Sequence, residues 1–221
     1  MNPTDLERQL VDLTGLADPV RRALYRYVVE RGAPVAREEA AGAVGISRAL
    51  AAYHLDKLVD EALLQVRFER RTGRRGPGAG RPSKLYLRSG RQIELSVPAR
   101  DYAALAELLA GAVEADPTGG ARGALHAAAR ALGAELGAEA ATPAAVRRLL
   151  ASRGYEPFDE PDGTIRLRNC PFDRIAARHP ELICGINLAI LEGLVDQCGE
   201  EGTRAVLEPA PGRCCVALTR R

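Results

Sequence analysis

The chain of 221 residues is 46% hydrophobic and 27% charged, so it is too apolar for a disordered protein and long enough for two small domains. Its 31 Lys and Arg residues against 29 Asp and Glu residues leave a net charge of +2, which excludes a uniformly basic or acidic protein. The positive charge is concentrated locally, because residues 66–88 hold eight Arg or Lys side chains and one Glu. A basic stripe of this kind is typical of phosphate binding.

Several classes of protein are not expected from this sequence. The first ten residues are polar, and no segment approaches the roughly 18 consecutive apolar residues of a membrane span. We therefore expect a cytoplasmic protein without membrane association, in which thiols stay reduced. We do not expect an enzyme, since the sequence shows no Ser/His/Asp arrangement, phosphate loop or zinc-hydrolase motif.

The first half of the chain carries the start and stop signals of three short helices. Asp18 followed by Pro19 is a typical helix start, and Gly32 ends that helix. A second helix is predicted over about residues 37–43. Ser47 then caps a third helix, which is predicted to run to about residue 61.

The third predicted helix is amphipathic, with Ala51, Leu55 and Leu58 facing a core. Its outer face carries small side chains and an arginine in the first turn, which suits close approach to a DNA major groove. We interpret His54, beside the inward Leu55, as structural rather than base-reading. The predicted DNA contacts on this helix are Ser47, Arg48, Ala49, Ala52, Tyr53 and Lys57.

A long basic hairpin is predicted to follow. Residues 64–68 and 84–88 alternate as strands, and the glycines and prolines between them prevent regular structure. The functional interpretation is a wing that enters or lies beside a minor groove, where arginine is favoured, and the alternative is a solvated loop. The predicted DNA contacts here are Arg70, Arg71, Arg74, Arg75, Arg81 and Lys84.

The order of these elements, with "GISRALAAYHLDKLVDEALL" and the basic hairpin, resembles the winged-helix regulators of the ArsR and DeoR type over residues 18–88. The resemblance implies a winged helix-turn-helix domain, placed at residues 1–97, that binds a double-stranded DNA operator. One departure is Ala62, where such proteins commonly place glycine. If Ala62 adopts a left-handed conformation, the cost is about 1 kcal/mol.

Two helices are predicted to link the halves of the chain, over residues 98–141. The first, from Asp101 to Ala115, has an apolar side, and the second is rich in alanine and covers about residues 122–136. Because two-fold operators require a two-fold protein, both helices are candidates for a homodimer interface. For the second helix, packing within one chain is the alternative. The apolar side of the first helix consists of Tyr102, Leu105, Leu108, Leu109 and Ala112.

The remaining residues, 142–221, are predicted to form a small α+β sensor domain, so the chain as a whole is α+β and mainly helical. Thr142 with Pro143 begins a helix to about residue 153, a hairpin turns at residues 161–163, and Cys170 opens a short helix to His179. A long helix runs from about Pro180 to residue 199. Two strands, about residues 204–208 and 214–218, close the chain.

All five cysteines lie beyond residue 169, which in a reducing compartment points to metal, cluster or redox chemistry. Cys198 is fourteen residues from Cys184 along one predicted helix, about 21 Å, so we interpret it as core filler. The usable set is Cys170, Cys184 and one of Cys214 or Cys215, with Cys215 preferred so that the face of Cys214 stays apolar. His179, Glu181 and Asn187 lie near enough in sequence to be considered for a fourth position.

The segments "NCPFDRIAARHPELICGINLAILEGL" and "PAPGRCCVAL" resemble the C-terminal domain of SufR-like regulators. This resemblance implies repression controlled by an iron–sulfur cluster, of the 4Fe–4S or 2Fe–2S type, held by Cys170, Cys184 and Cys214 or Cys215. A zinc site is one alternative. A second alternative is a domain without metal that responds to thiol oxidation or to a small organic ligand.

Overall fold

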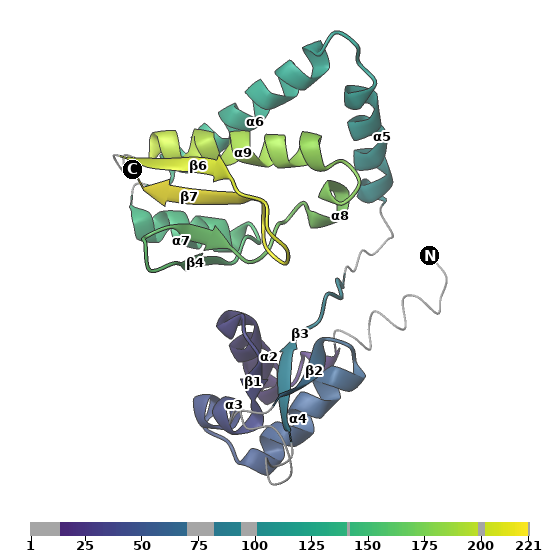
Figure 1. Cartoon of the computed structure of the whole chain (residues 1–221), viewed down its shortest axis with the longest axis vertical. Helices are drawn as coiled ribbons and strands as arrows, with labels where there is room; N and C mark the ends of the chain where they lie inside the picture. Colours follow the sequence, from purple (N-terminus) through teal and green to yellow (C-terminus); the bar gives the residue numbers. More distant parts are fainter. Residues whose placement is uncertain (1–13, 70–81, 94–100, 141, 199–201, 221) are drawn as a thin grey trace. The chain divides into compact units, whose positions relative to one another are not determined.

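The chain divides into two compact units, residues 1–100 and 101–221. The computed structural model describes residues 14–69, 82–93, 101–140, 142–198 and 202–220 (Figure 1). Helix predominates, and the predicted mixture of helix and strand is confirmed. The helices of the predicted linking segment, 98–141, belong to the same compact unit as residues 142–221.

The N-terminal unit has the elements that its sequence signals predict. Asp18 accepts a hydrogen bond from the Arg21 N–H at the start of the first described helix, and Ser47 accepts one from the Leu50 N–H. These caps satisfy amide groups that the first turn leaves without partners. The elements of this unit are α2 (Pro19–Arg31), β1 (Val35–Ala36), α3 (Arg37–Val44), α4 (Arg48–Asp60), β2 (Leu64–Glu69) and β3 (Ser83–Arg88).

The sheet of this unit has the order β1-β3-β2, and all its pairs are antiparallel. The two-residue strand β1, paired through Val35 with Tyr86, was not predicted because two residues show no periodicity. Leu24, Leu55 and Leu58 are fully buried in the core between helices and sheet. After α4 the chain turns through Ala62, whose φ of 56° is left-handed.

The C-terminal unit has two helical segments that the sequence assigned to a linker and a smaller α+β part that follows them. Asp101 and Thr142 cap the helices that the sequence predicts to begin there, and Pro143 and Pro180 occupy first turns. The elements are α5 (Tyr102–Glu114), α6 (Gly120–Ala138), α7 (Pro143–Ser152), β4 (Pro157–Asp159), β5 (Ile165–Leu167), α8 (Asp173–Ala176), α9 (Pro180–Gln197), β6 (Thr203–Leu207) and β7 (Val216–Arg220).

Helices α6 and α9 pack backbone against backbone, and glycines make this approach possible. A Cβ atom at Gly133 would overlap the carbonyl oxygen of Ile190, and one at Gly193 would overlap that of Arg130. The alternative of intramolecular packing, left open for α6 by the sequence, is therefore realised along this contact. Figure 1 shows α9 lying between α6 and strands β6 and β7.

The sheet of the C-terminal unit has the order β4-β5-β7-β6. Its core joins buried residues of α7, α9 and the sheet, among them Leu150, Leu167, Leu191 and Leu218. The last strand begins at Val216 rather than at residue 214, so the two adjacent cysteines precede it. This correction matters for the site, because residues before a strand do not have to alternate between its faces.

Within the described parts of both units, no helix is long and apolar enough to span a bilayer.

Candidate DNA-binding surface and thiol site

Helix α4 presents an outer face of the kind that the sequence predicted. Its inward residues Ala51, Leu55 and Leu58 are completely buried, and His54 is buried beside them. Facing outward, Arg48 and Ala49 are exposed, Ala52 is half-buried, and Tyr53 is 56% exposed. Because the inner face fixes the helix in the core, the outer face is held in one orientation.

The basic side chains of this face form ion pairs with carboxylates of the same chain. The Arg48 Nε atom lies 2.8 Å from Glu38 Oε1, which also accepts from Arg37 at 3.3 Å. Lys57 lies 3.8 Å from Asp60. These exposed pairs are weak and exchangeable, so Arg48 and Lys57 can reach a polyanion at small cost.

Leu50 is a residue of this face that the sequence analysis missed. It lies in the first turn of α4 and is 41% exposed, although leucine at this spacing is usually placed in a core. An apolar side chain on a groove-facing surface can contact a thymine methyl group. In the sequence, only its position between Arg48 and Ala52, two residues predicted to face outward, could have indicated that Leu50 is exposed.

The hairpin beside α4 is anchored through a partly buried polar contact. Asp56 of α4 accepts hydrogen bonds from Lys84 Nζ at 2.6 Å and from the Tyr86 hydroxyl at 2.8 Å. Burial opposes ionisation of Asp56, but these two donors hold its pKa below the usual value. The ammonium group of Lys84, which was predicted to contact DNA, is therefore hydrogen-bonded to Asp56 of α4.

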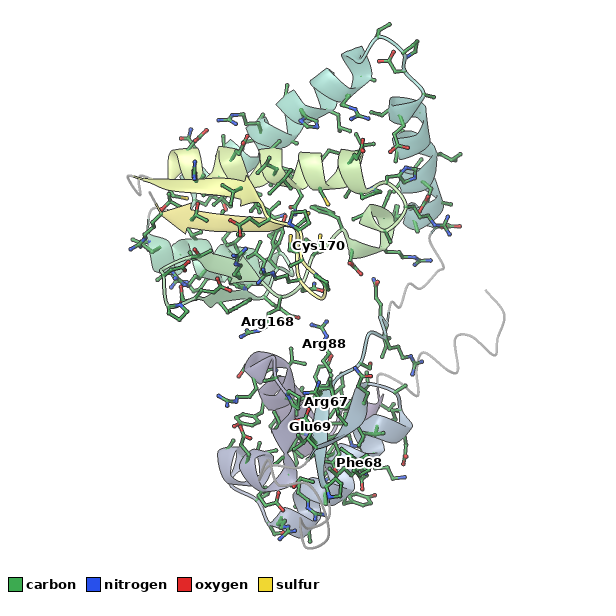
Figure 2. All side chains as sticks on the ribbon, viewed as in Figure 1. Arg67, Phe68, Glu69, Arg88, Arg168 and Cys170 are labelled. Atoms are coloured by element: carbon green, nitrogen blue, oxygen red, sulfur yellow. The ribbon has the colours of Figure 1, made fainter. Side chains whose placement is uncertain are left out.

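Figure 2 shows Arg67, Phe68 and Glu69 at the end of strand β2. Arg67 pairs with Glu69, and the ring of Phe68 is largely exposed at the same end of the strand. The loop arginines predicted to contact DNA lie outside the described residues; these are Arg70, Arg71, Arg74, Arg75 and Arg81.

In the C-terminal unit the thiols of four cysteines interact in a row. Cys214 acts on the ionisation of Cys170, Cys215 on that of Cys214, and Cys184 on that of Cys215, so neighbouring thiols of this set lie close together. All the cysteines are free thiols in this structure. We call Cys170, Cys214, Cys215 and Cys184 the thiol row, and it contains every residue that the sequence proposed as a cluster ligand.

Sheet pairing and one helix bring the thiol row together. Strands β5 and β7 are neighbours, and beyond their paired residues the Cys214 N–H donates to the Leu167 carbonyl at 2.9 Å. Cys170 follows three residues after Leu167, so the two thiols meet at the same end of the sheet. Figure 2 places Cys170 beside the loop that enters β7. Cys184, in the second turn of α9, completes the row.

The thiols of the row have unequal acidity. The neighbouring Cys170 thiol is the main cause that lowers the pKa of Cys214 to about 6, helped by the Val216 N–H and the Asn187 amide. The same proximity and burial raise the pKa of Cys170. Burial, followed by the nearby Cys184 thiol, raises the pKa of Cys215. The ionised form is therefore favoured at Cys214, beside its neighbours Cys170, Cys215 and Asn187.

The row does not enclose a single point. Among the residues described, no group of three or more His, Cys, Asp or Glu side chains is placed to hold a metal ion. Cys198 is buried elsewhere in the core, and its sulfur lies 3.0 Å from the Leu194 carbonyl oxygen. A buried position among apolar side chains is what the interpretation of Cys198 as core filler requires.

The three residues considered for a fourth position differ sharply. Glu181 is exposed at the start of α9. His179 contacts α5 instead, with its ring nitrogens 2.8 Å from Glu114 and 3.2 Å from Glu107. Asn187 is fully buried, and its Nδ2 donates to the Cys214 sulfur at 3.1 Å.

Helix α5 exposes the apolar side that the sequence assigned to a dimer interface. Tyr102, Leu105, Leu108 and Leu109 are all more than half exposed, with Leu108 at 72%. The opposite side is held to the rest of the unit through Ala110, which is buried, and through the two glutamates bonded to His179. The exposed side chains of this stripe carry no charge.

Comparison with known proteins bears on the N-terminal unit. Residues 16–67 match a family model described as a helix-turn-helix domain. The chain contains a helix-turn-helix domain. The match spans α2, α3 and α4 and enters β2, so the prediction of a helix-turn-helix domain is confirmed over these residues. No curated protein and no solved structure matches the chain.

Proposed function

We propose that this chain is a sequence-specific repressor of transcription that binds double-stranded DNA as a homodimer and is controlled by an iron–sulfur cluster. The observation that carries the proposal is the presence, in one chain, of a helix-turn-helix domain with an open outer face on α4 and a row of four interacting thiols. The first feature reads DNA, and the second responds to a signal.

In DNA recognition, α4 lies in the major groove, and the small side chains of Ala49 and Ala52 allow a close approach to base edges. Arg48 exchanges its surface partner Glu38 for a guanine edge or a phosphate. Tyr53 and Lys57 hold phosphates and fix the register of the helix. The arginines of the hairpin loop act as a wing that follows the minor groove.

The dimer forms through a second copy of α5 in this proposal. A contiguous stripe of large exposed apolar side chains is unusual on a monomer and marks an interaction surface. Both glutamates of α5 are bonded to His179 of the same chain. The stripe can therefore pack against the same stripe of a second chain without bringing like charges together. A two-fold dimer then matches two operator half-sites.

The donor chemistry of the thiol row fits a cluster better than a single ion. Thiolates are the usual ligands of iron–sulfur clusters, and they would be shared among several iron atoms, so the sulfurs need not converge on one point. Zinc requires four ligands around one centre, an arrangement absent from the described residues. Cys170, Cys184 and Cys214 or Cys215 would hold the cluster, which when bound supplies a centre sensitive to oxidants and iron supply.

Control of DNA binding follows from what the row connects. Its members come from the segment after β5, from α9 and from the segment before β7. Ligation of these thiols would fix α9, and α9 carries both α6 and the contact of His179 with α5. Fixing α5 sets the geometry of the dimer and with it the spacing of the two copies of α4.

The DNA-binding part is tested by selecting bound sequences from random duplexes and measuring the affinity of variants for the selected site. We expect Arg48→Ala to weaken binding about tenfold to a hundredfold, because one base contact is worth roughly 1–3 kcal/mol. Arg26→Ala, an exposed arginine of α2, is the control and should bind as the unmodified protein does. Absence of any selected sequence would contradict this part alone.

The dimer is tested by sedimentation of Leu108→Glu, which should be monomeric because the substitution places a charge in the stripe. Leu207→Glu changes another exposed leucine, on β6, and should leave the dimer intact. A protein that is monomeric before any substitution contradicts this part of the proposal.

The sensing part is tested by anaerobic purification with analysis of iron, sulfide and visible absorption. Cys170→Ser and Cys184→Ser should each lose most of the iron, whereas Cys198→Ser should retain it. If cluster-bound and cluster-free protein bind the operator with equal affinity, the cluster does not control DNA binding. Zinc in place of iron would support the alternative metal.

One observation favours a second candidate, control by thiol oxidation. Cys170 and Cys214 already interact, and so do Cys184 and Cys215, so the row contains two pairs of neighbouring thiols. A colourless protein that loses thiols on treatment with peroxide, and changes its operator affinity at the same time, would favour this candidate over a cluster.

A further inference from the structure

A buried polar chain leads from the protein core to the thiol row. The Tyr155 hydroxyl donates to Asn187 Oδ1 at 2.6 Å, and Asn187 Nδ2 donates to the Cys214 sulfur at 3.1 Å. Asn187 is 0% exposed and Tyr155 is 4% exposed, so no bulk water competes for these bonds. Burial of an amide is costly unless its groups are paired, and here both ends of the side chain are paired.

The orientation of the Asn187 amide decides what it can do. Its oxygen is occupied by the tyrosine hydroxyl, and its nitrogen, which is not a metal ligand, faces the sulfur. An N–H that donates to the sulfur restricts where that sulfur can point, so the amide orients Cys214.

The position of Asn187 in the fold extends this role. It lies three residues after Cys184 on α9, so one helix carries both a thiol of the row and the donor to another. Tyr155 lies before β4 and precedes Cys170 in the chain. The polar chain therefore couples three of the segments that bear or support the row.

We propose that Asn187, oriented by Tyr155, is a positioning residue that fixes the Cys214 sulfur as a ligand and tunes the bound cluster, and that it is not itself a ligand. This inference rests on the proposed cluster. Hydrogen bonds to cluster ligands offset negative charge, so they favour the reduced form and raise the reduction potential.

The experiment compares Asn187→Leu, Asn187→Asp and Tyr155→Phe, with Cys198→Ala as a control for a buried change at the end of the same helix. Readouts are iron and sulfide per protein, the reduction potential of the bound cluster, and thermal stability. We expect Asn187→Leu to retain iron and to lower the reduced-to-oxidised ratio roughly tenfold at a fixed potential, about 59 mV for one electron. Tyr155→Phe should act in the same direction but more weakly, and Cys198→Ala should leave the potential unchanged.

The opposite pattern would show that Asn187 is a ligand: Asn187→Leu loses iron, while the carboxylate of Asn187→Asp keeps it. A potential that is unchanged in Asn187→Leu and Tyr155→Phe would also overturn the inference, with the cluster itself intact. If Asn187→Leu does not fold, Tyr155→Phe decides, because it leaves the amide in place: a lowered potential with retained iron supports positioning, and an unchanged potential overturns it. Absence of iron from the unmodified protein would instead overturn the proposed function.

Discussion

The two units of this protein place their candidate functional residues in opposite ways. In the N-terminal unit they lie within a single helix, α4, so the fold has only to turn that helix outward. In the C-terminal unit the thiol row spans residues 170 to 215 and exists only where β5, α9 and the entry to β7 meet. The candidate surface of the first unit consists of exposed side chains of one helix. The candidate site of the second unit depends on the packing of several elements against one another.

This difference predicts how substitutions should act. A change on the outer face of α4 should alter affinity for DNA and leave stability nearly unchanged, because its side chains bury little surface. A change in the contact between α6 and α9 should alter stability first and the thiol row as a consequence. Substitutions that disturb one unit at a time test whether effects on DNA affinity and effects on stability are separate.

The largest effect is expected for Gly133→Ala, which places a methyl group against the backbone of Ile190. Overpacking at a backbone contact should destabilise the C-terminal unit by about 3 kcal/mol. Calorimetry should show a lower unfolding temperature for this unit and an unchanged one for the N-terminal unit. Gly123→Ala, in the same helix with open space around it, is the matched control and should be neutral or stabilising.

If Gly133→Ala lowered both unfolding temperatures equally, the two units would unfold as one, and the contrast between them would not hold.

A smaller and opposite effect is expected for Ala62→Gly in the N-terminal unit. Ala62 has a φ of 56°, and relief of this left-handed strain should stabilise the unit by about 1 kcal/mol. Greater freedom of glycine in the unfolded chain offsets part of that gain. Ala43→Gly, at an exposed helical position, should instead destabilise the unit. A lower unfolding temperature for Ala62→Gly would count against the strained turn.

The smallest effect is expected at His179, whose ring contacts Glu114 and Glu107 of α5 through both nitrogens. A neutral imidazole has only one donor, so this arrangement favours the charged form, and the bond with Glu114 is the main cause that raises the pKa of His179 above 6.5. The contribution to stability is full below pH 6.5 and is lost as the pH rises through the raised pKa of the folded state.

The unfolding temperature of the C-terminal unit should therefore show a pH-dependent component above pH 6.5 that His179→Gln removes. Glu107, Glu114 and Arg178, which lies 3.5 Å from Glu107, are the charged groups around this ring. His126→Gln is the control and should leave that component in place. An unchanged pH profile in His179→Gln would exclude this contact as its source.

Much of the fold could be predicted because its signals are local. The caps at Asp18, Ser47 and Thr142 act within one turn, and the structure confirms helices at each of them. The inward residues of α4 follow from helical spacing. Strand β1 could not be predicted, because it exists only through pairing with β3, and the start of the last strand was placed two residues too early for the same reason.

The sequence predicted which cysteines form the thiol row, but it did not predict which of them lie next to each other. Composition and spacing drew attention to Cys170, Cys184, Cys214 and Cys215, and the geometric argument separated Cys198. The apolar face expected around Cys214 gave a slight preference for Cys215, yet the structure brings both into the row, because these residues precede the strand and are not bound by its alternation. Asn187 was one of several neighbours in sequence, and only packing reveals its bond to Cys214.

The sequence by itself determined the helix boundaries, the outer face of α4, the basic hairpin and the choice of thiols, because each depends on residue type and on spacing along a few turns. Tertiary structure alone decided which thiols touch, that α6 packs on α9 through glycines, and that the apolar side of α5 stays exposed. These features depend on contacts between residues far apart in the chain, and no local pattern encodes which distant surface fills a given position.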